Sequence, residues 1–149
     1  MTRQRVLAAP LVLAALIALA GCAVPDPALV KSEAEAVFED LVSHAGETDA
    51  AILRSLETSP PADQACTGDD EGAVTSYTAT GTLSITAHEA EAAGILDALG
   101  DTLDPEEWTP IRPAVSEQSA WISEHDVVVT LTPEGPAIVV AVFTPCLTE

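Results

Sequence analysis

Apolar residues recur at helical spacing shortly after the apolar run near the start of the chain. Between residues 27 and 45 they repeat every three or four positions, with acidic side chains between them; the positions are Val30, Ala34, Val37, Phe38, Leu41, Val42 and Ala45. This period places them on one side of a helix, and Pro27 stands where a first helical turn tolerates proline.

A second, shorter helix is predicted directly after it. Thr48 or Asp49 can cap this helix, and its apolar positions are Ile52, Leu53 and Leu56. The Ser-Pro-Pro sequence at 59–61 is expected to end it, because proline interrupts helical hydrogen bonding. Residues 62–72 then form a predicted loop.

The clearest strand signal covers residues 73–87, where apolar and hydroxyl side chains alternate. One face carries Tyr77, Ala79, Gly81, Leu83, Ile85 and Ala87, and the other carries Ser76, Thr78, Thr80, Thr82, Ser84 and Thr86. Alternation of this kind is typical of a strand with one exposed face. A helix is predicted over residues 89–99, with Gly100 at its C-terminal end.

The remaining chain reads as short antiparallel strands. We expect an edge strand at 108–111, extended segments at 119–123 and 127–132, and a turn at 133–136. Residues 124–126 are either a turn or the middle of one long strand. Residues 137–143 are apolar on both faces and predict a central, covered strand.

These segments predict an α+β fold. N-terminal helices are followed by the order β-α-β-β, with two further strands if 124–126 is a turn. The sheet is expected to be mostly antiparallel, with helices packed on one face. Residues 29–149 would then form a single domain.

The first 21 residues resemble a bacterial lipoprotein signal peptide. Arg3 and Arg5 precede an apolar run over residues 6–20, which is short for a helix crossing about 30 Å of hydrocarbon. The run ends in Leu-Ala-Gly-Cys at 19–22, a sequence similar to a lipobox. Cleavage between Gly21 and Cys22 and acylation of the Cys22 thiol are therefore expected, with residues 22–28 as a lipidated tether. Alternatives are an ordinary secretory signal and an uncleaved anchor.

The whole chain has 24 acidic and five basic residues, a formal net charge of −19. Removal of the signal peptide leaves only Lys31, Arg54 and Arg112 against the same 24 acids, a formal charge of −21. A surface of this charge excludes nonspecific binding to nucleic acid. It is compatible with weak, site-independent binding of divalent cations.

The cysteines agree with an extracytoplasmic location. If Cys22 carries lipid, Cys66 and Cys146 remain as a pair, and an oxidising compartment favours a disulfide between them. This bridge forms most easily if the strand at 73–87 and the strand at 137–143 run antiparallel. If three or five strands run from the first of these to the second along the chain, the two are antiparallel. If there are four, they are parallel.

The chain resembles small lipoproteins of high-GC Gram-positive (actinobacterial) type that carry one cysteine pair. The resemblance rests on the lipobox, the spacing from Cys66 to Tyr77, and the closing sequence Val-Phe-Thr-Pro-Cys at 142–146. It implies a cellular address and a fold class, and no catalytic residue follows from it.

Motifs of catalysis are missing from the sequence. It contains no Gly-x-Ser-x-Gly elbow, phosphate-binding Gly-rich loop, HExxH pair or CxxC motif. No cofactor is therefore expected.

Three groups of side chains are candidates for ligand or metal binding. His88 and His125, with Asp126 or Glu89, can form a transition-metal site if their strands are neighbours. Residues 69–72 (Asp-Asp-Glu-Gly) offer oxygens for Ca²⁺ without the spacing of an EF-hand. Trp108 beside Glu106 and Glu107 suggests a sugar-stacking corner. The alternative in each case is ordinary packing or a solvated surface. The Ser and Thr side chains on one face of residues 73–87, which we call the hydroxyl ladder, could likewise present hydroxyls to a carbohydrate or peptide partner or form an ordinary solvated strand face.

The sequence thus favours a membrane-anchored, extracytoplasmic lipoprotein without enzymatic activity. Its expected partners are the membrane, through Cys22, and an envelope protein, wall component or small ligand. The alternatives are a cell-wall-modifying hydrolase that uses the acidic residues and a metal-binding lipoprotein.

Overall fold

The computed structural model of the chain describes residues 26–66, 74–86, 89–113, 115 and 117–148. Helix α1 (Pro27–Gly46) confirms the first predicted helix. The Asp26 carboxylate accepts a hydrogen bond from the Ala28 N–H at 3.0 Å and so caps the first turn, which Pro27 begins. The buried face of α1 consists of Val30, Ala34, Phe38, Leu41 and Ala45.

The second predicted helix is wrong, because these residues form strand β1 (Leu53–Ala65). β1 pairs antiparallel with β2 (Val74–Ile85), and this pairing takes up backbone groups that a helix would have satisfied internally. Pro60 and Pro61 end no helix. They lie at a register shift between Ser59 and Ala62, where an edge strand tolerates residues without an N–H.

The predicted loop at 62–72 is therefore wrong for its first four residues, which belong to β1. Its residues 67–72 lie outside the described part of the chain.

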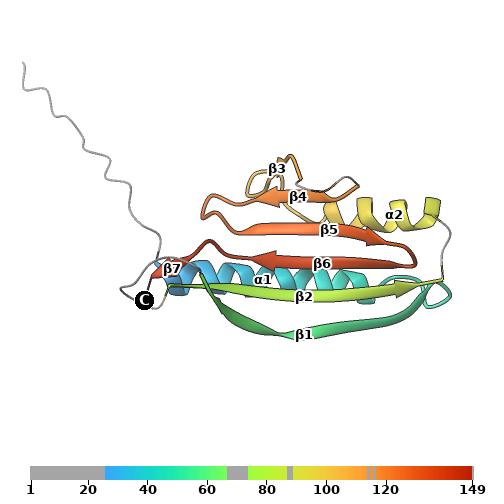
Figure 1. Cartoon of the computed structure of the whole chain (residues 1–149). Coiled ribbons are helices and arrows are strands. Elements are labelled where there is room, and N and C mark those ends of the chain that lie inside the picture. The colour runs from blue at the N-terminus through green and yellow to red at the C-terminus, as the bar shows by residue number, and fades with distance from the viewer. Residues whose placement is uncertain (1–25, 67–73, 87–88, 114, 116, 149) are drawn as a thin grey trace, which may run out of the picture.

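The strands form one antiparallel sheet, in the order β1-β2-β6-β5-β4-β3 (Figure 1). The C-terminal half supplies β3 (Thr109–Ile111), β4 (Ser119–Ile122), β5 (Val128–Glu134) and β6 (Ala137–Phe143). A seventh, short strand, β7 (Leu147–Thr148), pairs with the start of β2, on the side of β2 where β6 lies. The predicted turn at 133–136 is shorter than expected, because Pro133 and Glu134 still pair with β6 and only Gly135 and Pro136 reverse the chain.

Five strands run along the chain from β2 to β6, which is one of the two numbers that were expected to make β2 and β6 antiparallel. β6 is antiparallel to β2, and successive antiparallel pairs lead from β6 through β5 and β4 to β3. β2 and β3 are consequently parallel, joined through α2 (Glu89–Gly100), and residues 124–126 lie in the turn between β4 and β5. The predicted Cys66–Cys146 disulfide is present, with Cα atoms 6.1 Å apart.

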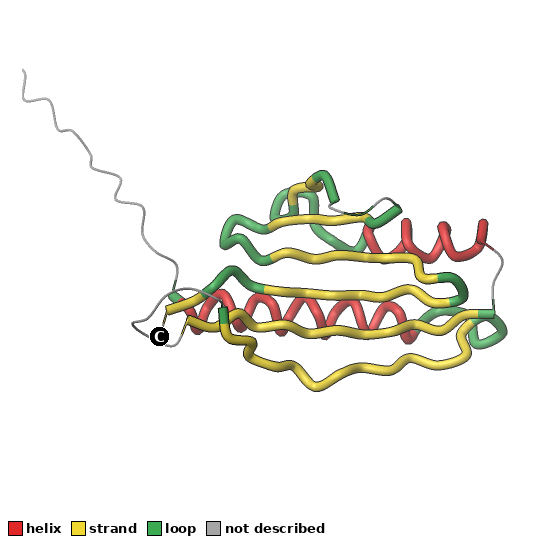
Figure 2. Tube along the Cα trace, in the orientation of Figure 1, coloured by secondary structure: helices red, strands yellow, loops and turns green. Residues whose placement is uncertain are grey.

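Both helices pack on one face of the sheet (Figures 1 and 2). The β-strand side chains that face them form the core, and one row of it runs across four strands through Ala79, Val142, Val129 and Trp121. Trp121 lies against the end of α2. A Cβ atom on Gly100 would be only 2.9 Å from its Cζ2 atom, so glycine is needed for this close approach.

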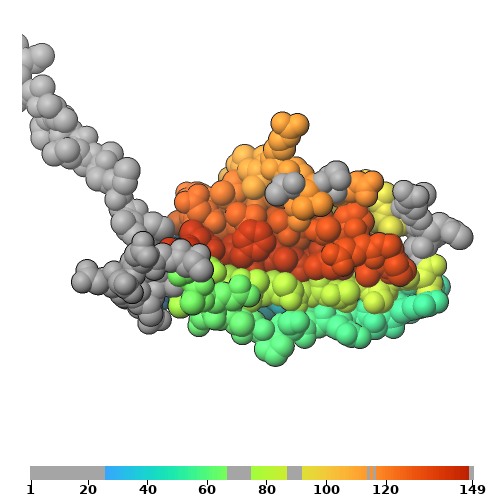
Figure 3. All heavy atoms as spheres, in the orientation of Figure 1, coloured from blue at the N-terminus to red at the C-terminus, as the bar shows by residue number. Residues whose placement is uncertain are grey.

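No helix of the described residues covers the opposite face, which we call the open face. Its β2 side chains are the predicted hydroxyl ladder, and Thr78, Thr80 and Thr82 are half-buried there. Phe143 and Val139 of β6 lie beside them in register, as the space-filling view shows for the surface formed by β2, β6 and β5 (Figure 3). β6 is thus central, as predicted, but covered by helices on one face only.

Candidate functional site

A cleft of about 520 Å³ lies between α1 and two loops of the C-terminal half. One loop joins α2 to β3, and the other is the β4–β5 turn. Six of the described residues that line the cleft are acidic, and none is Lys or Arg; the acids are Glu33, Asp40, Asp104, Glu106, Glu107 and Glu124. We call this the acidic cleft.

α1 forms one wall of the acidic cleft with a single stripe of side chains. Glu33, Ala36, Val37 and Asp40 are spaced three, four and seven residues apart, which places them on one face of a helix. The buried positions of α1 lie on a neighbouring stripe, so the same helix contributes to the core and to the cleft. Its two acids bracket a small apolar surface.

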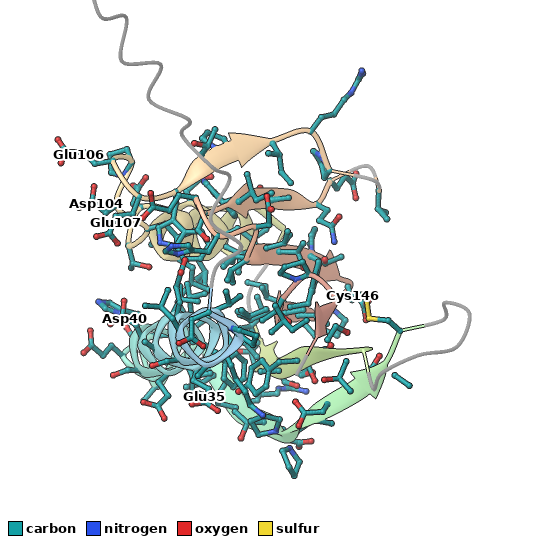
Figure 4. All side chains as sticks on the ribbon, turned by 90° about the vertical axis from the view of Figure 1, so that its left-hand side faces the viewer. Glu35, Asp40, Asp104, Glu106, Glu107 and Cys146 are labelled. Atoms are coloured by element: carbon teal, nitrogen blue, oxygen red, sulfur yellow. A yellow bond between two sulfur atoms is a disulfide. The ribbon has the colours of Figure 1, made fainter. Side chains whose placement is uncertain are left out.

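The loop before β3 is held by hydrogen bonds centred on Asp104. Its carboxylate accepts from the Glu106 N–H at 2.8 Å, and its carbonyl accepts from the N–H groups of Trp108 at 2.8 Å and Glu107 at 3.0 Å. Leu103 and Trp108 are buried and form the apolar floor of the cleft. Asp104, Glu106 and Glu107 remain exposed, and their side chains extend from this loop on the side where Asp40 projects from α1 (Figure 4).

The β4–β5 turn closes the acidic cleft with a histidine. The Ser123 hydroxyl oxygen accepts hydrogen bonds from the N–H groups of His125 and Val127, both at 3.3 Å, and Asp126 adopts a positive φ of 62°. The His125 Nδ1 atom lies 2.6 Å from Oε2 of Glu33. Its Nε2 atom lies 3.8 Å from Oε1 of Glu124. The imidazole is therefore flanked by two carboxylates and ties the turn to α1.

This arrangement suits cation binding better than covalent catalysis. Carboxylates on several sides form charge-assisted hydrogen bonds with a positively charged group, and the Val37, Leu103 and Trp108 surfaces can contact an apolar part of the same molecule. Ser123 is the hydroxyl-bearing nucleophile candidate nearest in sequence to His125, but its oxygen accepts hydrogen bonds within its own turn. The histidine is oriented by Glu33 toward Glu124 instead.

The structure brings the predicted ligand candidates Trp108, Glu106 and Glu107 together in the acidic cleft, and it adds His125 to them. Sequence reasoning missed Glu33, Asp40, Asp104 and Glu124. A signal for the first two was present, because both lie on one face of the predicted N-terminal helix. Nothing in the local sequence indicates that this face meets the β4–β5 turn.

The candidate metal ligands from the sequence are distributed over several parts of the chain. His88 and residues 69–72 lie outside the described residues. In the part of the chain that is described, no three His, Cys, Asp or Glu side chains are grouped so that they could hold a metal ion. Asp126, the proposed partner of His125 in such a site, is exposed.

The pKa values of His44 and Tyr77, which both lie outside the acidic cleft, are raised. A hydrogen bond to the Asp40 carbonyl raises the pKa of His44, and the charges of Asp40 and Glu47 act in the same direction. Burial raises the pKa of Tyr77 under α1, and the charges of Glu35, Glu39 and Asp63 raise it further.

No protein-family model, curated protein or solved structure matches the chain. Within the described residues, no helix is long and apolar enough to cross a membrane. Gly21 and Cys22 lie outside these residues, so cleavage and lipidation stay predictions from the sequence.

Proposed function

We propose that the chain is a lipid-anchored, extracytoplasmic binding protein whose acidic cleft binds a positively charged organic ligand. The observation that carries this proposal is the composition of the cleft. Among the described residues, six carboxylates line it, no Lys or Arg side chain lines it, and its floor is apolar. A cationic ligand would replace the mutual repulsion of these acids by attraction.

The apolar floor favours an alkylammonium group over a bare metal ion. Hard metal ions require several oxygens converging on one point, whereas the carboxylates here are distributed around a cleft of about 520 Å³. An amine on a hydrocarbon chain places its charge near the carboxylates and its carbon atoms against Val37 and Leu103. Trp108 contributes an aromatic surface to the same floor.

The anchoring part of the proposal rests on the lipobox-like sequence ending at Cys22. Two or three acyl chains on one cysteine exceed what a single chain provides and give stable attachment. Cys22→Ser is expected to move the protein from the membrane fraction to the soluble fraction. Retention of this variant in membranes would contradict the lipobox interpretation.

Binding can be tested by calorimetric titration of the mature lipidated protein, which begins at Cys22, in detergent micelles, with spermidine as the probe and sucrose as an uncharged control. The Glu106→Gln/Glu107→Gln variant removes two charges from the cleft and is expected to weaken spermidine binding at least tenfold, since each charge-assisted hydrogen bond contributes about 1.5–3 kcal/mol. Trp108 fluorescence provides a second readout.

The matched control is Glu57→Gln/Glu134→Gln, which removes the same charge from exposed strand positions outside the cleft. If both double variants weaken binding equally, the probe responds to net charge alone and the cleft is not the site. Calcium chloride serves as a third titrant. Saturable Ca²⁺ binding at one site, with no response to spermidine, would favour the metal-binding alternative.

One observation favours the alternative function, a wall-modifying hydrolase. Glu106 and Glu107 do line a cleft next to Trp108, as a sugar-hydrolysing site would require. Incubation with purified cell-wall glycan, followed by assay of new reducing ends, separates the two functions. Turnover that disappears in the Glu106→Gln/Glu107→Gln variant would establish the hydrolase and refute a role in binding alone.

A further inference from the structure

We infer that one end of the folded domain faces the lipid headgroups, and that Leu29 of α1 contacts them. This end, which we call the tethered end, consists of the first turn of α1, strand β7, and the Cys66–Cys146 disulfide. The inference rests on the anchoring of Cys22 under the proposed function and deepens it by naming the surface that meets the membrane.

The length of chain between the anchor and the domain sets the orientation. Cys22 and Asp26 are four residues apart, and four extended residues span at most about 14 Å. The Cα atom of Asp26, which caps α1, is therefore held within that distance of the lipidated cysteine. The 20 residues of α1 rise about 30 Å, so its far end at Gly46 points away from the anchor's attachment point.

An ion pair and a hollow lie at the tethered end. A small hollow there is lined by Asp26, Ala28 and Lys31 of α1 together with Asp63, Thr75 and Leu147. The Lys31 Nζ atom lies 3.0 Å from the Asp63 carboxylate and 5.4 Å from the centre of the Tyr77 ring. The only lysine of the mature chain is thus paired at the end that carries the tether.

Leu29 is an exposed apolar side chain of this end. It lies in the first turn of α1 and is 51% exposed, one of three large apolar side chains exposed in the described part of the chain. The other two, Ile111 and Val115, lie in and after β3. Ile111 is in register, through β4, β5 and β6, with Thr80 in the middle of β2, six residues from Val74 at the tethered end.

The acidic cleft is close to the bilayer in this orientation. Glu33 follows Asp26 by seven residues of helix, about 10 Å, so its Cα atom lies within about 25 Å of that of Cys22. Figure 4 views the domain from the tethered end and shows Asp40, Asp104, Glu106 and Glu107 projecting on one flank of the domain. The ligand of the cleft would consequently be met at the membrane surface.

The test uses the mature lipidated protein in phosphatidylcholine vesicles, which carry no net charge to repel the acidic domain. Tryptophan is introduced by Leu29→Trp and, as a control of similar exposure, by Val115→Trp, which is 55% exposed in the parent. Phosphatidylcholine brominated high on its acyl chains quenches tryptophans whose rings reach the acyl region just beneath the headgroups. Fluorescence is compared with the wild-type protein, which supplies the background of Trp108 and Trp121.

Leu29→Trp is expected to be quenched at least twofold more strongly than Val115→Trp. Ala28→Trp reports on the same exposed turn and keeps the test valid if Leu29→Trp disturbs folding. Equal quenching of Leu29→Trp and Val115→Trp, or stronger quenching of Val115→Trp, would overturn the orientation while leaving the anchor intact. Failure of the wild-type protein to float with the vesicles would overturn the anchoring, and the orientation with it.

Discussion

The Nδ1 atom of His125 lies 2.6 Å from the Oε2 atom of Glu33, a residue 92 positions earlier in the chain. The pair joins the second turn of α1 to the β4–β5 turn, and both side chains are less than one-third exposed. It is the direct link between the two walls of the acidic cleft among the described residues. Because the other ring nitrogen of His125 lies 3.8 Å from Glu124, the imidazole stands between a carboxylate of the turn and one of the helix.

Loss of this contact is expected to destabilise the protein modestly. His125→Ala and Glu33→Ala should each lower the free energy of unfolding by about 1 kcal/mol, as for other partly buried hydrogen bonds. The double variant should lose less than the sum of the two single variants, since the pair can be broken only once. Urea denaturation followed by circular dichroism measures all three; strictly additive losses would show that the two side chains are not coupled.

A pair of glycine substitutions in α2 tests the packing of this helix on the sheet. A Cβ atom at Gly100 would approach the Trp121 ring to 2.9 Å, so Gly100→Ala is expected to cost about 1–3 kcal/mol of stability. A Cβ atom at Gly94 meets nothing within 4 Å, so Gly94→Ala is expected to stabilise the protein by about 0.5–1 kcal/mol through helix propensity. Thermal unfolding should move in opposite directions for the two variants, and a shift in the same direction would contradict the close approach.

The disulfide is expected to supply a large share of the stability of this small domain. It links positions 80 residues apart, and in the chain-entropy model this restricts the unfolded chain by about 4 kcal/mol. The Cys66→Ser/Cys146→Ser variant should therefore unfold at a distinctly lower guanidinium concentration than the oxidised protein. Reduced wild-type protein is the control and should match the variant; an unchanged midpoint would show that the bridge contributes little.

Alkaline pH is expected to destabilise the fold through Tyr77. Its pKa is raised in the folded state by burial and by neighbouring carboxylates, so the unfolded chain loses this proton at lower pH than the folded protein does. The free energy of unfolding should consequently fall as pH rises above the usual tyrosine pKa. Tyr77→Phe should flatten this part of the pH profile.

Tyr77 is the single tyrosine of the chain, so ultraviolet titration of the phenolate reports on this residue alone. In the folded protein its midpoint should lie above that of the urea-unfolded chain. Coincident midpoints would contradict the effect of burial.

The periodicity of apolar side chains was sufficient to predict β2, α1 and α2. Residues 74–85 alternate so regularly that the buried and exposed faces of β2 follow directly, because successive strand side chains point to opposite faces. α1 and α2 follow from the spacing of their apolar residues. The cysteine pair, taken with the chain directions, selected three or five strands from β2 to β6.

Tertiary contacts decided what local pattern left ambiguous. Ile52, Leu53 and Leu56 have helical spacing, yet β1 forms because one edge of β2 would otherwise leave its backbone groups unpaired. The same holds for the acidic cleft. Glu106, Glu107 and Trp108 are neighbours in sequence, so the sequence groups them. Glu33 meets His125 only because α1 runs along the sheet and its second turn lies beside the β4–β5 turn. The sequence by itself determined each element's faces, and only the packing of those faces on one another determined which distant side chains share a site.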